Sequence, residues 1–305
     1  MTAPERVERS ELFVPAGQWS MLVKAAASEA DAVCIDLEDS VPLAAKENAR
    51  GNVVRALKER NFGGRTRVVR INSLETKFAA EDIGAIVLGA GEHIDLVMVP
   101  KVGSPNTVIQ VDKLLGQFEA EIDRRIPIGV EAQIETAAGF LYAREIAQTP
   151  RLETLIFGSG DYAASMGMPA AGIGTFDEHD ELYPGHRWHA VMHTIVAAAR
   201  ANGLRCLDGP YAAHKDAGGF ERACKIARSM GFDGKQCIHP AQLAIANKAF
   251  SPTKQEVETA TAVLAAYVAA AEKGRGAVTL DGKMIDEANV RMARGVLARV
   301  ERIRK

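Results

Sequence analysis

Short apolar or alternating runs recur along the chain, and longer segments with helical spacing of apolar residues separate them. A period of two indicates a strand and a period near 3.6 indicates an amphipathic helix. The predicted strands are 11–15, 32–37, 67–71, 94–99, 130–134, 155–157, 204–208 and 234–238. The predicted helices that follow them are 19–29, 43–59, 79–89, 106–124, 137–148, 186–202, 216–230 and 241–249.

This order of strands and helices predicts the fold class. Eight strand-then-helix units within residues 1–250 are typical of a (β/α)₈ barrel, an α/β TIM barrel. A doubly wound open sheet is the alternative. We prefer the barrel because the units number eight and because no G-x-G-x-x-G motif follows an early strand.

Two segments lie outside a bare barrel. Residues 166–185 are rich in Gly, Pro, Asp and Glu, and a connection this long in a compact domain is usually functional or disordered. Residues 251–305 form a predicted C-terminal helical extension, a lid or oligomerisation element. Its helices are 252–273 and 284–304, with the turn-like sequence GRGAVTLDGK between them.

The most informative stretch is 128–161, where two strand-like runs end in acids and enclose one helix. Successive strand residues point to opposite faces, so Glu131, Gln133 and Glu135 share a polar face. The second run ends at a Gly-Ser-Gly sequence, which Asp161 follows directly. If the strands are parallel neighbours, both carboxylates lie at their carboxyl ends and can supply oxygen ligands to a hard divalent cation. The alternative is that Thr136 and Asp161 simply cap the helices that they precede.

Other predicted strand ends carry charge as well. In strand 32–37 and the residues after it, Asp36 and Glu38 face inward while Asp39 lies in the loop. Arg70 lies near the end of the third strand, and Lys101 follows the fourth. Several acids beside two cations suggest a metal site next to an anion site, because inward charges are costly unless paired or metal-bound. An Arg70–Glu38 ion pair that only stabilises the barrel is the alternative.

Bulk properties narrow the class of protein. The 305 residues are 47% hydrophobic and 25% charged, as in ordinary globular proteins, and the net charge of −2 gives no general attraction to nucleic acids or acidic membranes. The first residues do not resemble a signal peptide, and no apolar run approaches the roughly 20 residues of a membrane span. The four cysteines form no C-x-x-C pair and indicate buried free thiols in a reducing compartment, so we expect a cytoplasmic protein.

Longer motifs cover nearly all of the chain. They are RSELFVPA, DAVCIDLEDSVPLAAKENAR, VVRIN, VMVPKV, AQIETAAG, FGSGDYAASMG, DGPY, GFDGKQCIHPAQLAIANKAFSP and GKMIDEANVRMAR. With these motifs the chain resembles the citrate lyase β-subunit and malyl-CoA lyase family, in the HpcH/HpaI aldolase superfamily. The GSGDYAASMGM stretch and the long loop are most similar to malyl-CoA and β-methylmalyl-CoA lyases. Citrate lyase subunits usually carry an acid where this chain has Gly160.

The resemblance implies roles for individual residues. Glu135 and Asp161 match the family's Mg²⁺ ligands, with Mn²⁺ as a possible substitute. Arg70 matches the arginine near the thioester carbonyl, and Asp286 matches a catalytic acid that can reach the site of a neighbouring subunit. Beyond these residues, the resemblance implies that Glu38 and Asp39 contact metal-bound water, that Gly160 lies in the substrate site, and that Arg9 and the His239-Pro240 turn are candidates for contact with CoA.

The implied activity is Mg²⁺-dependent, reversible cleavage of a 3-hydroxyacyl-CoA. Malyl-CoA or β-methylmalyl-CoA would give acetyl-CoA or propionyl-CoA plus glyoxylate. The alternatives are a citramalyl-CoA or citryl-CoA lyase, a class II aldolase acting on a free 2-oxo acid, and a non-catalytic binding subunit. The expected partners are CoA thioesters, 2-oxo acids and further copies of the chain in a trimer or hexamer, with no nucleic acid and no membrane.

Overall fold

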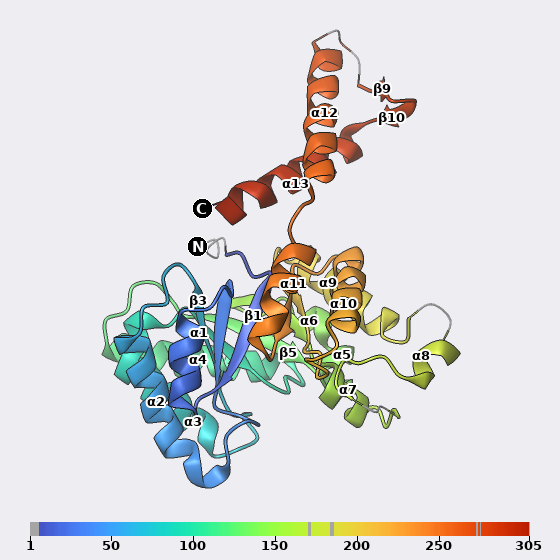
Figure 1. The fold of residues 1–305 in the computed structure, drawn as a ribbon. Coiled ribbons are helices and arrows are strands. Elements are labelled where there is room, and N and C mark those ends of the chain that lie inside the picture. Colours follow the sequence, from blue (N-terminus) through green and yellow to red (C-terminus); the bar gives the residue numbers. More distant parts are fainter. Residues whose placement is uncertain (1–5, 170–171, 184–185, 273, 275, 305) are drawn as a thin grey trace. The chain divides into compact units, whose positions relative to one another are not determined.

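The computed structural model describes residues 6–169, 172–183, 186–272, 274 and 276–304 (Figure 1). The chain divides into two compact units. One unit contains Glu8–Phe250, and the other is built from Ser251–Lys305.

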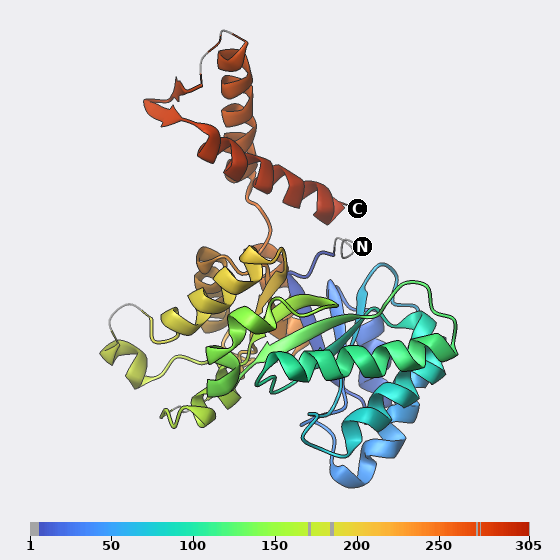
Figure 2. The same ribbon diagram turned by 180° about the vertical axis from the view of Figure 1, so that it is seen from behind.

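The first unit is a closed barrel of eight parallel strands in the order β1 to β8, with helices around it (Figures 1 and 2). This confirms the predicted (β/α)₈ barrel. The strands are β1 (Ser10–Pro15), β2 (Ala32–Asp36), β3 (Thr66–Arg70), β4 (Leu96–Val99), β5 (Gly129–Ile134), β6 (Leu152–Phe157), β7 (Arg205–Asp208) and β8 (Gly234–Cys237). Strand β8 pairs with β1 and closes the barrel.

Helices follow the strands as the periodicity predicted. They are α1 (Trp19–Ala26), α2 (Lys46–Glu59), α3 (Phe78–Ala90), α4 (Pro105–Glu121), α5 (Ala137–Leu141), α6 (Ala143–Ile146), α9 (His189–Ala201), α10 (Ala217–Met230) and α11 (Leu243–Ala249). The connection after β6 carries α7 (Ser159–Ser165) and α8 (Glu178–Leu182). Short 3₁₀ turns occur at η1 (Leu43–Ala45), η2 (Gly91–His93) and η3 (Pro240–Gln242).

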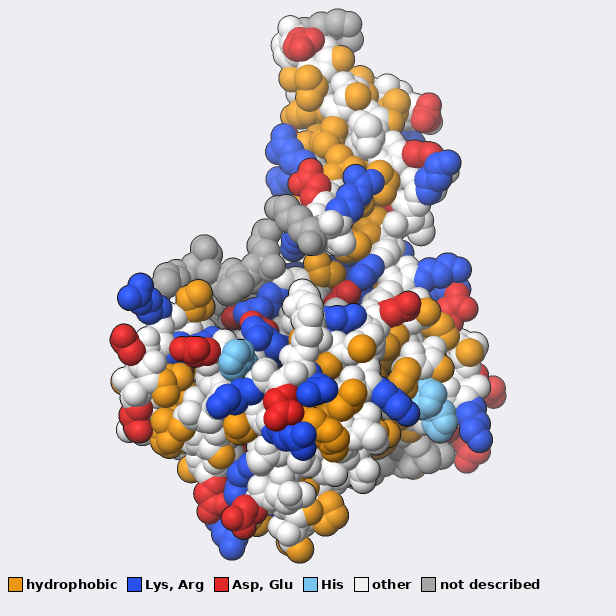
Figure 3. Space-filling model, turned by 60° about the vertical axis from the view of Figure 1, so that its left-hand side comes forward, with side chains coloured by type: hydrophobic (Ala, Val, Ile, Leu, Met, Phe, Trp, Pro, Cys, Tyr) orange, Lys and Arg blue, Asp and Glu red, His pale blue; other side chains and the backbone are white. Residues whose placement is uncertain are grey.

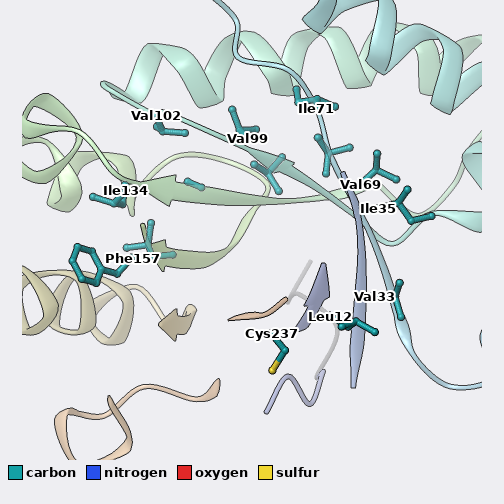
Figure 4. Packing of buried hydrophobic residues seen from close by; sticks show 14 of the residues in the cluster. Leu12, Val33, Ile35, Val69, Ile71, Val99, Val102, Ile134, Phe157 and Cys237 are labelled. Atoms are coloured by element: carbon teal, nitrogen blue, oxygen red, sulfur yellow. The ribbon is translucent and has the colours of Figure 1, made fainter. Parts of the chain in front are cut away.

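Alternation along the strands produces two apolar layers. Outward-facing residues such as Val33, Ile35 and Val69 belong to the large cluster that includes helix residues (Figure 4). Inward-facing residues such as Cys34 and Met98 form a smaller cluster inside the barrel. All four cysteines are buried and free, as predicted. Among the described helices, none combines the length and apolar character needed to cross a membrane.

The barrel interior also contains carboxyl groups remote from solvent. Glu11 of β1 and Glu131 of β5 are fully buried and lie within hydrogen-bonding reach of each other, and the amide of Gln236 donates to Glu11 Oε2 at 3.3 Å. Two ionised carboxylates only accept hydrogen bonds, so one of this pair must carry a proton for the two to bond. Burial, with the nearby Glu8 carboxylate, raises the pKa of Glu11 to about 8. Burial raises the pKa of Glu131 well above its ordinary value.

The structure corrects two predicted helices. The segment 137–148 is divided at Tyr142 into α5 and α6. The segment 284–304 is helical only from Glu287, because the preceding residues form a β-hairpin of β9 (Val278–Leu280) and β10 (Lys283–Ile285). Its turn is Asp281-Gly282, with φ of 47° and 75°. A two-residue Asp-Gly turn with positive φ at both positions matches the twist of a hairpin, so the flanking residues pair as strands.

The second unit consists of α12 (Lys254–Ala271), this hairpin and α13 (Glu287–Arg304). Thr253 and Glu256 form a capping box at the start of α12. A small cluster that includes Val263, Ile285 and Ala293 holds the helices and the hairpin together. Other apolar side chains of the unit are exposed, and hydrophobic side chains gather along it in Figure 3.

The buried Glu11–Glu131 pair generates a prediction about stability. Between the ordinary carboxyl pKa of 4.5 and the folded value near 8, the unfolded chain has released the Glu11 proton while the folded chain retains it. The free energy of unfolding therefore decreases as pH rises through this window. We expect Glu11→Gln to reduce this decrease between pH 5 and 8, as measured by urea unfolding. The exposed Glu121→Gln is the control, and an unchanged pH dependence in Glu11→Gln would contradict the prediction.

Candidate active site at the carboxyl end of the barrel

An open cavity of about 700 Å³ lies at the carboxyl ends of the strands. TIM barrels place their chemistry at this end. The cavity brings together residues from β1, β3 and β8 and from the loops after β2, β5, β6 and β7. Its lining includes Phe13, Asp39, Ser40, Arg70, Gln133, Glu135, Gly158, Gly160, Asp161, Gly172, Ile173, Pro210, Gln236 and Ile238.

Glu135 follows β5 and is 2% exposed. Gln133 lines the same cavity and Glu131 lies beside Glu11 inside the barrel, which supports the polar inward face predicted for this strand. One carboxylate oxygen, Oε1, accepts a hydrogen bond from the backbone N–H of Lys101 at 2.7 Å. Burial raises the pKa of Glu135 to about 8, and the negative charge of Asp161 adds to this increase. A positive charge placed beside Glu135 would therefore favour the ionised carboxylate at neutral pH.

Asp161 lies in the first turn of α7, whose N-cap is Gly158 and not an acid. The capping alternative therefore fails for Asp161, whereas Thr136 does cap α5 by accepting from the Gly139 N–H at 2.9 Å. The Asp161 side chain is 45% exposed. A Cβ at Gly158 would lie 2.5 Å from Glu135 Oε2, so the end of β6 approaches this carboxylate because residue 158 has no side chain.

Lys101 connects these acids to the end of β2. Its φ of 51° is unusual for a non-glycine residue and directs the backbone N–H at Glu135. Its Nζ lies 2.5 Å from Glu38 Oε1, 3.4 Å from Asp39 Oδ1 and 3.8 Å from Asp161 Oδ2. Burial opposes the ammonium charge, but the hydrogen bond with Glu38 and the surrounding carboxylates raise the pKa of Lys101. Lys101 thus stays charged and holds the carboxylates in place.

Arg70 projects from β3 into the same cavity. Its Nε and Nη2 donate to the two oxygens of Asp36 at 2.6 and 2.8 Å, and Nη1 lies 3.2 Å from Glu38 Oε2. The ion pair considered from the sequence exists, but Asp36 is its main partner and Glu38 is the second. The guanidinium also stacks over the Phe13 ring, 5.1 Å from the centroid. These contacts fix the position of the guanidinium in the cavity wall.

The structure does not bring every candidate to this cavity. Arg9 precedes β1 at the opposite, amino end of the barrel, where its Nε lies 2.7 Å from Asp31 Oδ2. Pro240 begins η3 after β8 but does not line the cavity, and the adjacent His239 stacks on His214. Asp208 pairs with Lys235 in a small space between the barrel and its helices.

Asp286 belongs to the second unit and caps α13. Its Oδ1 accepts from the Ala288 N–H at 2.9 Å and from the Asn289 N–H at 3.3 Å. The Asn289 side chain in turn accepts from the Asp286 N–H at 3.0 Å. These hydrogen bonds satisfy the first turn of α13. The catalytic role stays a prediction.

Sequence reasoning missed part of the cavity wall. Phe13 and Gln236 face inward by strand alternation, so the period of two was a signal that identifies them. Ile173 comes from the long connection after β6, and no pattern in that segment indicated its position.

A divalent cation at this site would need oxygen ligands from the cavity wall. Within the described parts of the chain, no group of three or more His, Cys, Asp or Glu residues is arranged to hold a metal. Glu135 and Asp161 supply two carboxylates beside an open cavity. Mg²⁺ is usually bound by one or two carboxylates, with water and substrate oxygens completing the octahedron. These residues therefore fit Mg²⁺ shared with a substrate, and not a closed metal cage.

Several known proteins are similar to this chain over nearly its full length. An L-malyl-CoA/β-methylmalyl-CoA lyase from Cereibacter sphaeroides is 38% identical over 307 residues, spanning 98% of this chain and 96% of the relative. A (3S)-malyl-CoA thioesterase from the same species is 36% identical and spans 97% and 95%. The crystal structure of protein CitE from Mycobacterium tuberculosis, in complex with magnesium, acetoacetate and coenzyme A, is 30% identical. It aligns with a TM-score of 0.77 over 97% of this chain and 98% of that chain.

The family model described as HpcH/HpaI aldolase/citrate lyase matches residues 9–240, a range that contains the whole cavity wall. Together with the identity to the lyase over nearly its full length, this match shows that the chain belongs to the HpcH/HpaI aldolase/citrate lyase family.

Proposed function

We propose that this protein is a Mg²⁺-dependent carbon–carbon lyase acting reversibly on a 3-hydroxyacyl-CoA. Malyl-CoA or β-methylmalyl-CoA would give acetyl-CoA or propionyl-CoA plus glyoxylate. One observation carries the proposal: the carboxylates of Glu135 and Asp161 face the same cavity as the guanidinium of Arg70. Retro-Claisen cleavage needs this combination, because negative charge develops at the thioester end while the other product leaves as an oxo acid.

Glu135 and Asp161 would hold Mg²⁺, or Mn²⁺ in its place. When bound, the cation would lower the pKa of the substrate hydroxyl and hold the 2-hydroxycarboxylate end. Glu38 and Asp39 would contact metal-bound water while they keep Lys101 in position. The Lys101 N–H holds Glu135 through Oε1, which would leave Oε2 to bind the cation.

Arg70 would stabilise the charge that forms on the thioester oxygen, in the manner of an oxyanion hole. Its bidentate pairing with Asp36 fixes the guanidinium plane before substrate arrives. An acid must then protonate the enolate carbon of the departing acyl-CoA, and in the reverse direction the same group removes that proton. We assign this step to Asp286.

Thioester hydrolysis is the second candidate, because a relative named as a thioesterase is almost as similar as the relative named as a lyase. In hydrolysis, water attacks the thioester carbonyl that Arg70 would polarise. Citramalyl-CoA and citryl-CoA remain alternative substrates. The helical second unit argues against an aldolase that acts on free 2-oxo acids. The full set of acids with Arg70 argues against a non-catalytic binding subunit.

We also infer a homo-oligomer, a trimer or hexamer. Three apolar side chains of the second unit, Val268, Met284 and Met292, are 57%, 70% and 63% exposed, and packing against another chain would cover them. The buried free thiols support a reducing compartment, and we propose the cytoplasm.

A panel of malyl-, β-methylmalyl-, citramalyl- and citryl-CoA, each with and without Mg²⁺, tests the function. We expect Mg²⁺-dependent release of a shorter acyl-CoA and glyoxylate from the first two esters. Free CoA thiol with intact malate as the only products would establish the thioesterase instead. No reaction with any ester would contradict both.

The metal ligands give the first activity prediction. Glu135→Ala or Asp161→Ala should lower kcat at least about 10³-fold, because the cation supplies several kcal/mol of transition-state stabilisation. The variants should stay folded by circular dichroism. Glu145→Ala, on the exposed side of α6, is the control. Near-normal activity of either variant across a Mg²⁺ titration would show that the metal assignment is wrong.

Arg70 gives the second activity prediction. Arg70→Lys keeps the charge but loses the planar fork that pairs with Asp36, so kcat should fall about 10²-fold or more. Arg67→Lys is a matched control, since Arg67 lies on the same strand and pairs with Asp95 away from the cavity. A change limited to KM in Arg70→Lys would mark a ground-state binding residue and not an oxyanion donor.

Asp286 gives the third activity prediction. Asn caps helices as well as Asp does, but an amide does not transfer protons, so Asp286→Asn should keep the melting temperature and lose most lyase activity. Asp286→Ala, as a comparison, should also lose about 1 kcal/mol of stability. Full activity of Asp286→Asn would reduce the residue to a cap. Partial recovery of lyase activity on mixing with Glu135→Ala would show that the second unit completes the active site of a neighbouring subunit.

A further inference from the structure

The long connection after β6 returns to the cavity through the segment 172–176. The backbone carbonyl of Ile173 accepts a hydrogen bond from the Ala212 N–H at 2.9 Å. Gly174 has φ of 68°, and a Cβ at this position would lie 2.2 Å from the Pro210 carbonyl oxygen. Only glycine fits there, so the segment is tied closely to the loop after β7.

Further contacts anchor the residues that follow. Phe176 packs on Tyr211, with ring centroids 6.4 Å apart, and Arg222 lies over the Phe176 ring at 4.4 Å. The buried Arg187 guanidinium forms ion pairs with Asp177 at 3.1 Å and with Asp180 at 3.3 Å. The segment beside the cavity is thus held by contacts on its C-terminal side.

Ile173 is a large aliphatic residue that is 46% exposed and lines the cavity. Its side chain covers Gly160. A Cβ built on Gly160 would lie 3.0 Å from Ile173 Cγ1 and 3.3 Å from both Cδ1 and Cγ2. Gly160 and Ile173 therefore form one continuous apolar wall, in which a larger residue at 160 would require the Ile173 side chain to shift by a few tenths of an ångström.

This wall is next to Asp161, the proposed metal ligand. On the proposed function, the 2-oxo acid binds there through its carboxylate and carbonyl oxygens. Its remaining substituent, on the carbonyl carbon, is a hydrogen in glyoxylate and a methyl group in pyruvate. An aliphatic wall excludes bulk, and it offers no hydrogen bond to a charged substituent, whose burial without a partner is costly.

We propose that Ile173, packed on Gly160, is a specificity-determining residue that selects a 2-oxo acid with hydrogen on its carbonyl carbon. This inference rests on the proposed function and deepens it. The wall of Ile173 and Gly160 would discriminate between an aldehyde acceptor and a ketone acceptor at the same metal site.

The test measures condensation of acetyl-CoA with glyoxylate and with pyruvate in Mg²⁺. We expect Ile173→Ala to raise kcat/KM for pyruvate relative to glyoxylate at least about tenfold, the lower end of the effect of one methylene in an apolar pocket. Ile173→Val should give a smaller change in the same direction. Leu182→Ala, an exposed aliphatic truncation in α8 of the same connection, is the control and should leave the ratio unchanged.

A second variant pair tests the contact itself. Gly160→Ala places a methyl group against Ile173 and should lower condensation with both oxo acids, and Ile173→Ala in the same chain should restore part of that activity. Additive losses would show that the two residues do not form one wall. An unchanged pyruvate-to-glyoxylate ratio in folded Ile173→Ala would overturn the inference.

Calorimetric titration of pyruvate and glyoxylate in Mg²⁺ separates this failure from failure of the proposed function. If the wild type forms no carbon–carbon bond, the lyase proposal fails. The inference about the wall is then judged by binding alone: Ile173→Ala should bind pyruvate more tightly relative to glyoxylate, and equal relative affinities in both proteins would refute it.

Discussion

The site depends on how Lys101 neutralises and orients the acids around it. One residue at the end of β4 reaches three neighbouring loops: its N–H bonds to Glu135, and its ammonium lies near Glu38, Asp39 and Asp161. Buried carboxylates are costly without such partners. The positive φ of Lys101 is a strained backbone conformation. It occurs where the backbone N–H and the side chain of one residue bind different acids, and such strain is common at functional sites.

The barrel explains why this arrangement can be held in place. Eight parallel strands end at one rim, so residues remote in sequence meet there. Arg70 illustrates the result, because Asp36 on the neighbouring strand fixes its guanidinium plane in the cavity wall. Below this rim, the buried Glu11–Glu131 pair and its apolar neighbours fill the barrel interior.

Sequence alone predicted the barrel, because eight repeats of period two followed by period 3.6 leave few other topologies. It also brought Glu135, Asp161, Glu38, Asp39 and Arg70 to one end, since each ends or follows a strand. It did not predict that Arg9 would pair with Asp31 at the other end, because such a partner is remote in the sequence. Ile173 could not be found, because its position depends on the tertiary contacts of Gly174 and Ala212. The hairpin around Asp281-Gly282 was missed although the dipeptide signals such a turn.

The central claim is that Glu135 and Asp161 present one divalent cation to a 2-oxo acid. A crystal structure of the protein with Mg²⁺ and glyoxylate measures this directly. The account predicts a single octahedral cation about 2.0–2.1 Å from an oxygen of each carboxylate, with the oxo acid bound to the same cation and next to Ile173. A cation bound elsewhere, or an oxo acid held without either carboxylate on its metal, would contradict the account.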